Sequence, residues 1–367
     1  MPRKQLEILR DLFVAYKENN RLSFIDHADE YVRYLKWKKF GFKALEFEKI
    51  INDIKSGNPY KNDNIIAHDI KDDKSPLPDL FGQTNSSAKY QQAKSPYVWQ
   101  ISKGAQLDFM QAAHLIEQLT LTSYKIISSK VISSILGYTT DKAEGFSRIL
   151  FYIGLLEDKT RKPTSLAKLI FNNDKYFDDI GTLWFLHYYI SSNDKLVIWS
   201  RISNFLFSKS TFNYADVVSL LDDQRNFHTE ESFRTHLRKE YKTCVNAYIE
   251  SSFNKLNIIS TDELKEIFTK AKTSFVPDDI FLAATILFKN RYYPSEVALE
   301  IKLLANAQNS PGKLFYMNDR QVRDALDRLR MKGLINVESM ADLDQIKFVK
   351  YQDYIPVLEK YYSEKYL

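Results

Sequence analysis

Residues 131–162 read VISSILGYTTDKAEGFSRILFYIGLLEDKTRK, and this stretch decides the predicted fold. Val131, Ile132 and Ile135 predict a short amphipathic helix. Gly137 stands in the turn that follows, where a tight reversal of the backbone favours glycine. A second helix faces inward with Ala143, Phe146, Ile149, Leu150 and Ile153, and a charged run at 157–162 comes after it. Helix, tight turn, helix and a basic hairpin form the outline of a winged helix-turn-helix.

A similar outline recurs near the carboxyl end of the chain. Residues 317–332 are strongly helical, with Asn318 and Asp319 as N-cap candidates and Gly333 as the C-cap. The stretches 334–337 and 346–349 alternate as two strands of a hairpin. The predicted fold class is mainly α: a multi-domain helical protein with two winged helix-turn-helix-like modules that carry small β-hairpin wings.

The composition agrees with a helical protein. The 367 residues include only ten glycines and ten prolines, where average usage would give about 26 and about 18. A chain so poor in turn-forming residues favours helices over many short strands. The formal net charge of +5 is a mild excess, so only local clustering of the cations can argue for a nucleic-acid partner.

The single cysteine, Cys244, forms no internal disulfide and no cysteine-cluster metal site, which favours a reducing compartment. The first residues are charged and amphipathic and lack the apolar core of a signal peptide. No apolar run approaches the roughly 18 residues of a membrane span. We therefore expect a cytoplasmic protein with no membrane partner.

The chain divides into five predicted regions. Residues 1–60 read as helices, and residues 61–100 form a polar linker rich in turn-forming residues. Residues 101–162 form the first winged-helix-like domain, residues 163–275 a helical middle domain, and residues 276–367 the second winged-helix-like domain. The apolar stretch at 182–190 is expected to be buried.

The solvent face of the second helix and the charged run after it supply the candidate DNA contacts. A recognition helix would reach the major groove, the hairpin would touch phosphates, and the C-terminal helix would add arginines. The predicted contact residues are Thr139, Thr140, Lys142, Ser147, Arg148, Lys159, Arg161, Lys162, Arg320 and Arg323.

Each of these candidate surfaces also has an interpretation that does not involve DNA. Asp141 and Glu144 oppose phosphate on the second helix of the first module, where docking to a protein is about equally expected. Aspartates interleave with the arginines of residues 319–332, which also suits a salt-bridged solvent face. Residues 31–43, YVRYLKWKKFGFK, suit base stacking with phosphate contact. An amphipathic helix with snorkelling lysines explains that stretch better.

The middle and C-terminal regions resemble a known family over roughly residues 120–350. The residues that carry the resemblance are Pro163-Thr164, Leu166, Phe171, Asp174, Tyr176, Asp179, Thr182, Leu183, Trp184, His187, Ser310-Pro311-Gly312, Phe315, Leu343 and Ile346. They resemble the bacterial proteins grouped as domain of unknown function 4007, although the opening Gly-His-Glu-Thr-Phe-like segment of that family is missing here. The resemblance implies an accessory role near phosphorothioate DNA modification and phage defence.

The residues of that motif also have structural interpretations. Trp184 and His187 lie one turn apart on a very apolar helix, so a buried, hydrogen-bonded histidine is the preferred interpretation. Asp174, Asp178 and Asp179 suit helix caps and first-turn acids rather than metal ligands.

The sequence thus predicts a non-enzymatic, DNA-associated accessory or regulatory protein of a bacterial defence or DNA-modification system. It leaves open an adaptor that scaffolds a partner enzyme, and a homo-oligomer. A less favoured alternative is a metal-dependent nuclease using Asp278, Glu300 and Lys302, although residues 297–305 read as a helix, on which Glu300 and Lys302 point to different faces. No phosphate-binding loop, dinucleotide fingerprint or histidine metal spacing occurs, so no cofactor or metal is predicted.

Overall fold

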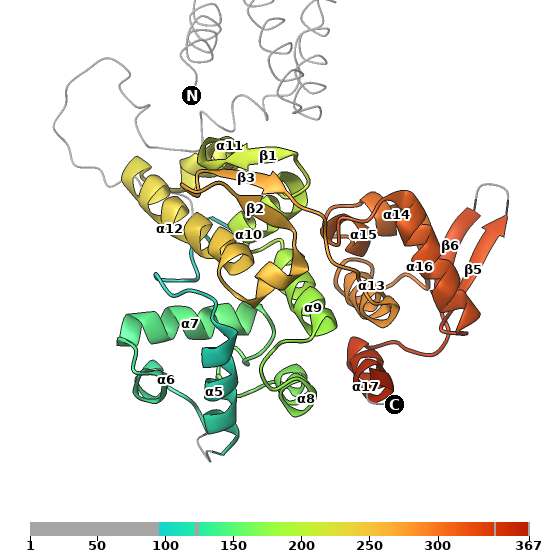
Figure 1. The fold of residues 1–367 in the computed structure, drawn as a ribbon, viewed down its shortest axis with the longest axis horizontal. Helices are drawn as coiled ribbons and strands as arrows, with labels where there is room; N and C mark the ends of the chain where they lie inside the picture. Colours follow the sequence, from blue (N-terminus) through green and yellow to red (C-terminus); the bar gives the residue numbers. More distant parts are fainter. Residues whose placement is uncertain (1–94, 122–124, 341–342, 366–367) are drawn as a thin grey trace, which may run out of the picture. The chain divides into compact units, whose positions relative to one another are not determined.

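The computed structural model describes residues 95–121, 125–340 and 343–365. Three predictions lie outside the described residues: the helices of residues 1–60, the basic and aromatic stretch at 31–43, and residues 61–94 of the linker. The described part is mainly helical, as predicted, with two small antiparallel sheets (Figure 1).

Residues 95–276 contain eight of the α-helices described. They are α5 (Phe109–Thr120), α6 (Ser129–Leu136), α7 (Thr140–Tyr152), α8 (Ser165–Asn173), α9 (Ile180–Ser191), α10 (Val197–Arg201), α11 (Tyr214–Leu220) and α12 (Glu230–Ile249). Three short helices of other types also occur: η1 (Ile202–Leu206), η2 (Asp222–Phe227) and η3 (Ser252–Leu256). A three-stranded sheet of β1 (Thr211–Asn213), β2 (Ile259–Thr261) and β3 (Ile267–Lys270) has the order β1-β3-β2.

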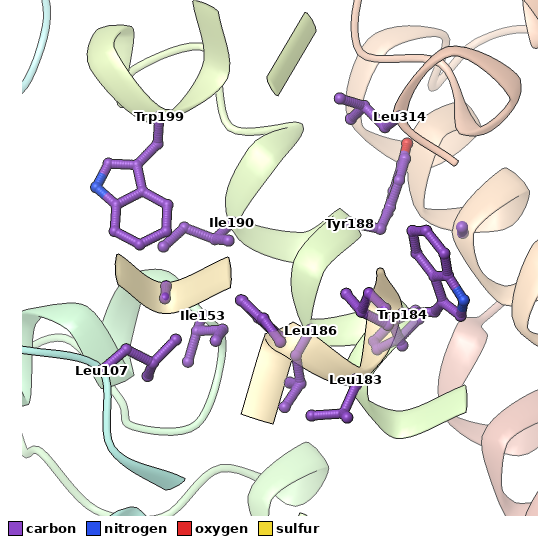
Figure 2. Close-up of a cluster of buried hydrophobic side chains, with 14 of the residues drawn as sticks. Leu107, Ile153, Leu183, Trp184, Leu186, Tyr188, Ile190, Trp199 and Leu314 are labelled. Carbon is purple, nitrogen blue, oxygen red and sulfur yellow. The ribbon is translucent and has the colours of Figure 1, made fainter. Parts of the chain in front are cut away.

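Helix α9 is the central element of this region. Every residue from Gly181 to Tyr188 is buried, as the sequence predicted for residues 182–190. Its side chains project in different directions: Leu186 points toward Ile153 and Ile190 toward Trp199, whereas Tyr188 points toward Leu314 (Figure 2). A helix that is apolar on all faces is buried on all faces, and α9 therefore packs against both the preceding helices and the C-terminal region.

The C-terminal region begins with α13 (Asp278–Tyr292) and ends with α17 (Tyr354–Lys365). Between them lie β4 (Ala298–Glu300), α14 (Ile301–Asn306), α15 (Pro311–Leu314), α16 (Asp319–Met331), β5 (Ile335–Met340) and β6 (Leu343–Phe348). The sheet order is β4-β6-β5, and all pairs are antiparallel. The predicted helix and hairpin are confirmed: Asn318 caps α16 in a capping box, and Gly333 follows the helix with φ of 67°.

The segment 297–305 differs from its prediction. Residues 297–305 are not a continuous helix, because Ala298–Glu300 pairs with residues 345–347 of β6 and the helix begins only at Ile301. The edge of β6 offers backbone partners to β4, and a ladder between distant segments overrides the local helical preference.

The buried side chains of the described residues form one continuous hydrophobic cluster, to which α5, α9, α12, α13 and α16 all contribute. The predicted domain boundaries at 162 and 275 stay predictions. No helix among the described residues is long and apolar enough to cross a membrane.

Candidate nucleic-acid interface

Helices α6 and α7 meet at a tight turn in which Gly137 stands as predicted. Ser128 caps α6 by accepting a hydrogen bond from the Val131 amide, and Gly137 ends the helix with φ of 66°. Thr139 then caps α7, because its Oγ1 accepts a hydrogen bond from the Lys142 amide at 3.3 Å. The first turn of α7 is thereby fixed in position and points its Thr140 and Lys142 side chains into solvent.

The charged run at 157–162 forms a tight turn with a single β-bridge, Leu156 to Pro163, at its base. The sequence predicted a strand leading into a hairpin, whereas the structure has this one bridged pair. The turn is attached to the start of α6: the Ile127 amide donates to the Thr160 carbonyl at 2.9 Å, and Arg161 Nη1 donates to Ser129 Oγ at 2.6 Å. These two hydrogen bonds hold the 157–162 turn beside the start of α6.

Seven of the eight contact residues predicted in this module reach the surface. Thr139, Thr140, Lys142, Lys159 and Lys162 are exposed, while Arg148 and Arg161 are half-buried. Lys142 also lies over the Tyr138 ring, with Nζ 3.9 Å from the ring centroid. The α6–α7 surface is defined here as these seven residues.

The position predicted for Ser147 was wrong. Its side chain is buried, and its Oγ donates to the Glu144 carbonyl at 2.8 Å. On another face of α7, Ser102 approaches so closely that a Cβ added to Gly145 would stand 1.8 Å from the Ser102 carbonyl oxygen. Only the first turn of α7 is consequently free to enter a groove.

The segment that covers α7 is itself held by a buried carboxylate. Glu240 of α12 accepts hydrogen bonds from the amides of Ile101 and Ser102 through Oε2, and from Trp199 Nε1 through Oε1 at 2.9 Å. Burial raises the pKa of Glu240, although these donors favour its ionised form. Sequence analysis missed this arrangement; a glycine in the middle of an amphipathic helix was the one signal of a close backbone approach.

The charge around the α6–α7 surface is positive. Residues 125–162 carry seven basic and four acidic side chains. One of the acids, Glu144, is paired with Lys103 at 3.0 Å, and a hydrogen bond from Lys103 together with the charges of Arg161 and Arg148 lowers its pKa. Glu144 therefore does little to oppose an approaching phosphate.

The arginines of α16 form a different kind of surface. Arg323 makes a two-pronged ion pair with Asp344 of β6, and Arg328 makes one with Asp278 of α13. Arg330 lies 3.5 Å from Asp327. Of the two predicted contacts here, Arg320 is exposed, whereas Arg323 is engaged within the molecule. Residues 276–367 carry thirteen basic and thirteen acidic side chains, so this region is charge-balanced.

The residues of the nuclease alternative take separate roles in the structure. The Asp278 carboxylate is 9% exposed and contacts Arg328 and Lys332. Glu300 ends β4, and Lys302 lies exposed in the first turn of α14. Within the described ranges, no three His, Cys, Asp or Glu side chains are grouped so that they could hold a metal ion.

Three family-like residues, Asp179, Thr182 and His187, are buried and hydrogen-bonded. Asp179 caps the helix, accepting from the Thr182 amide and from Tyr361 Oη, and pairs with Lys365. Thr182 Oγ1 lies 2.6 Å from Tyr362 Oη. The preferred interpretation of His187 is confirmed: it is fully buried, and burial lowers its pKa to about 4.

Two solved structures share this fold. A crystal structure of SspB matches with a TM-score of 0.59 and 16% sequence identity, covering 74% of this chain and 89% of that one. A structure described as magnesium ion-bound SspB matches with a TM-score of 0.58 and 15% identity, covering 72% and 87%. No curated protein matches the chain.

The family resemblance is confirmed on a longer stretch than the motif residues alone. The model of the family described as protein of unknown function DUF4007 matches residues 152–362, which is more than half of the sequence. This stretch begins near the end of α7 and extends into α17. The chain belongs to the DUF4007 family.

Proposed function

We propose that this protein is a non-enzymatic, DNA-associated accessory protein that contacts duplex DNA through the α6–α7 surface. The observation that carries the proposal is the free first turn of α7, exposed beside the basic 157–162 turn in a segment with three more cations than acids. In helix-turn-helix proteins the N-terminal residues of the second helix contact base edges while flanking cations hold phosphates. Thr139, Thr140 and Lys142 take the first role, and Arg148, Lys159, Arg161 and Lys162 take the second.

The module that presents this surface is proposed to be a winged helix. Its support is the order α5, α6, glycine turn, α7 and bridged turn, with the last anchored to α6. A second winged helix is proposed for residues 276–367, supported by α16 followed by the β5–β6 hairpin and by the short strand β4. The second module serves mainly as scaffold, because its arginines are paired internally.

The proposed setting is a bacterial defence or DNA-modification system in the cytoplasm, as the family resemblance implies. The relevant ligand is then duplex DNA with or without a phosphorothioate linkage. A phosphorothioate keeps the charge of the phosphate, so contacts to the backbone alone would hold both forms equally, and any preference would have to come from groups near the sulfur.

The test is equilibrium binding of the full chain to a fluorescent duplex at several salt concentrations. Arg148→Glu and Arg161→Glu are each expected to weaken binding about tenfold, because one charge-assisted contact is worth about 1.4 kcal/mol. The matched control is Lys302→Glu, which reverses an exposed, unpaired cation in the charge-balanced region. Equal, weak binding by the wild type and all three variants would refute the proposal.

The proposal that the protein is not an enzyme is tested separately. Since one similar structure is described as magnesium-bound, the chain is incubated with Mg²⁺ and either modified or unmodified duplex. The proposal expects intact DNA. Cleavage or nicking that disappears in Glu300→Gln would instead favour the nuclease alternative.

A second function, as an adaptor for a partner protein, is supported by a different surface. Val297, Met331 and Val349 are 80%, 76% and 54% exposed. The backbone brings them to one end of the second module: Val297 precedes β4 opposite the end of β6, and the Val349 amide bonds to Leu334, three residues after Met331. A complex that co-purifies without DNA and is lost in Met331→Lys would support this function.

A further inference from the structure

Helix α12 carries a row of cations that lack acidic partners. Arg238, Lys239 and Lys242 are exposed, and among the described residues none of them has an ion pair. Arg238 instead lies over the Tyr214 ring, 5.8 Å from its centroid. The one acid in the stretch 234–242 is Glu240, which is 1% exposed and engaged by amides and Trp199. This row, called the α12 row below, therefore presents positive charge alone.

The chain segment 101–105 joins α12 to α7, the helix that supplies most of the α6–α7 surface. The amide of Ser102 donates to Glu240 on α12, while the Ser102 carbonyl packs against Gly145 on α7. Two further contacts are made by the same segment: Lys103 pairs with Glu144 of α7, and Thr243 Oγ1 of α12 donates to the Ala105 carbonyl at 3.3 Å. In Figure 1, α7 and α12 both lie on the same side of α9.

We infer that the α12 row is a second contact for the DNA backbone, on the helix that residues 101–105 join to α7. The inference rests on the proposed function and enlarges the surface that is proposed to contact DNA. From Arg238 to Lys242 the helix rises about 6 Å, at 1.5 Å per residue. That rise corresponds to roughly two phosphates of one strand at 3.4 Å per nucleotide along the duplex axis. Flexible lysines and one arginine at this spacing position a backbone without reading its sequence.

An ordinary solvated helix face would show the same exposure, so the contact must be tested by counting phosphates. Each neutralised phosphate contributes about 0.9 to the slope of log K against log salt concentration. The triple variant Arg238→Gln/Lys239→Gln/Lys242→Gln is expected to lower the slope by about 2 to 3 and to weaken binding to all duplex sequences alike. The substitutions are on the surface and should leave the unfolding transition almost unchanged.

The matched control removes three exposed cations elsewhere: Lys168→Gln/Lys302→Gln/Lys350→Gln, none of which has an ion pair in the described part of the chain. It is expected to leave the slope within about 0.5 of the wild type. If the wild type binds duplex DNA and Arg148→Glu weakens it, but the α12 triple variant keeps the wild-type slope, the inference fails and the proposed function stands. If the wild type shows no salt-dependent binding to the duplex, both fail.

Discussion

His187 Nε2 lies 2.9 Å from the carbonyl oxygen of Leu314, so the imidazole of α9 is hydrogen-bonded to the segment that begins Ser310-Pro311-Gly312. The other ring nitrogen, Nδ1, lies 2.6 Å from Tyr248 Oη. Because a carbonyl oxygen only accepts, Nε2 carries the proton and Nδ1 accepts from the tyrosine. Two family-like sequence segments 127 residues apart are thus joined by one neutral histidine inside the core.

This histidine makes the stability of the protein depend on pH. Burial lowers the pKa of His187 to about 4 in the folded state, against an ordinary value of 6.5. The unfolded chain therefore binds more protons between these values, and the stabilisation present above pH 6.5 is lost as the pH falls toward 4. Between pH 7.5 and pH 5 the loss is about 2 kcal/mol.

The measurement is urea unfolding of the wild type and His187→Gln at both pH values. Glutamine does not titrate, so the stability difference between the two proteins is expected to shrink by about 2 kcal/mol at pH 5. If the stability difference between the two proteins is the same at pH 7.5 and pH 5, the pKa of His187 is not lowered in the folded protein.

A substitution of Gly145 tests how closely residues 101–105 approach α7. In Gly145→Ala the new methyl group would stand 1.8 Å from the Ser102 carbonyl oxygen, so the segment must move and strain its bonds to Glu240. We expect a loss of more than about 3 kcal/mol in the free energy of unfolding, as for severe overpacking.

Gly137→Ala is the matched control, because nothing lies within 4 Å of its added Cβ while its φ is 66°. Only the left-handed backbone penalty of about 1 kcal/mol applies there. Thermal or urea unfolding of both variants should rank them in that order; the reverse order would mean that residues 101–105 do not cross α7 as described.

A substitution of Arg328 tests whether the arginines on α16 have a structural role. Its guanidinium donates to both oxygens of Asp278, and 40% of its side chain is exposed, so solvent screens part of the attraction. Arg328→Gln should cost about 1 kcal/mol of stability and leave duplex binding unchanged. A double-mutant cycle with Asp278→Asn measures the coupling. A variant that keeps its stability but loses DNA binding would move the interface to α16.

The sequence predicted correctly the turns, caps and helix faces that depend on residues close together in the chain. The predicted places are occupied by Gly137, by the N-cap Asn318 and by the inward-facing residues Ala143, Phe146, Ile149, Leu150 and Ile153. Caps and amphipathic spacing act over a few residues, so a single sequence contains them.

The parts that sequence could not supply depend on distant partners. The sequence interpretation placed Ser147 outward, but the folded chain buries it, and Ser102 packs against Gly145 of the same helix from more than forty positions earlier. Arg323 and Arg328 do project from α16, yet Asp344 and Asp278 engage them from other elements. The same is true of β4, whose residues form a strand only because β6 lies alongside.

Amide hydrogen exchange of the full chain, with and without duplex DNA, locates the interface most directly. We expect slower exchange on adding DNA in residues 128–142 and 157–162, with residues 319–331 of α16 unchanged. Protection confined to α16, or no change in α6, the first turn of α7 and the 157–162 turn under conditions where the duplex is bound, would contradict it.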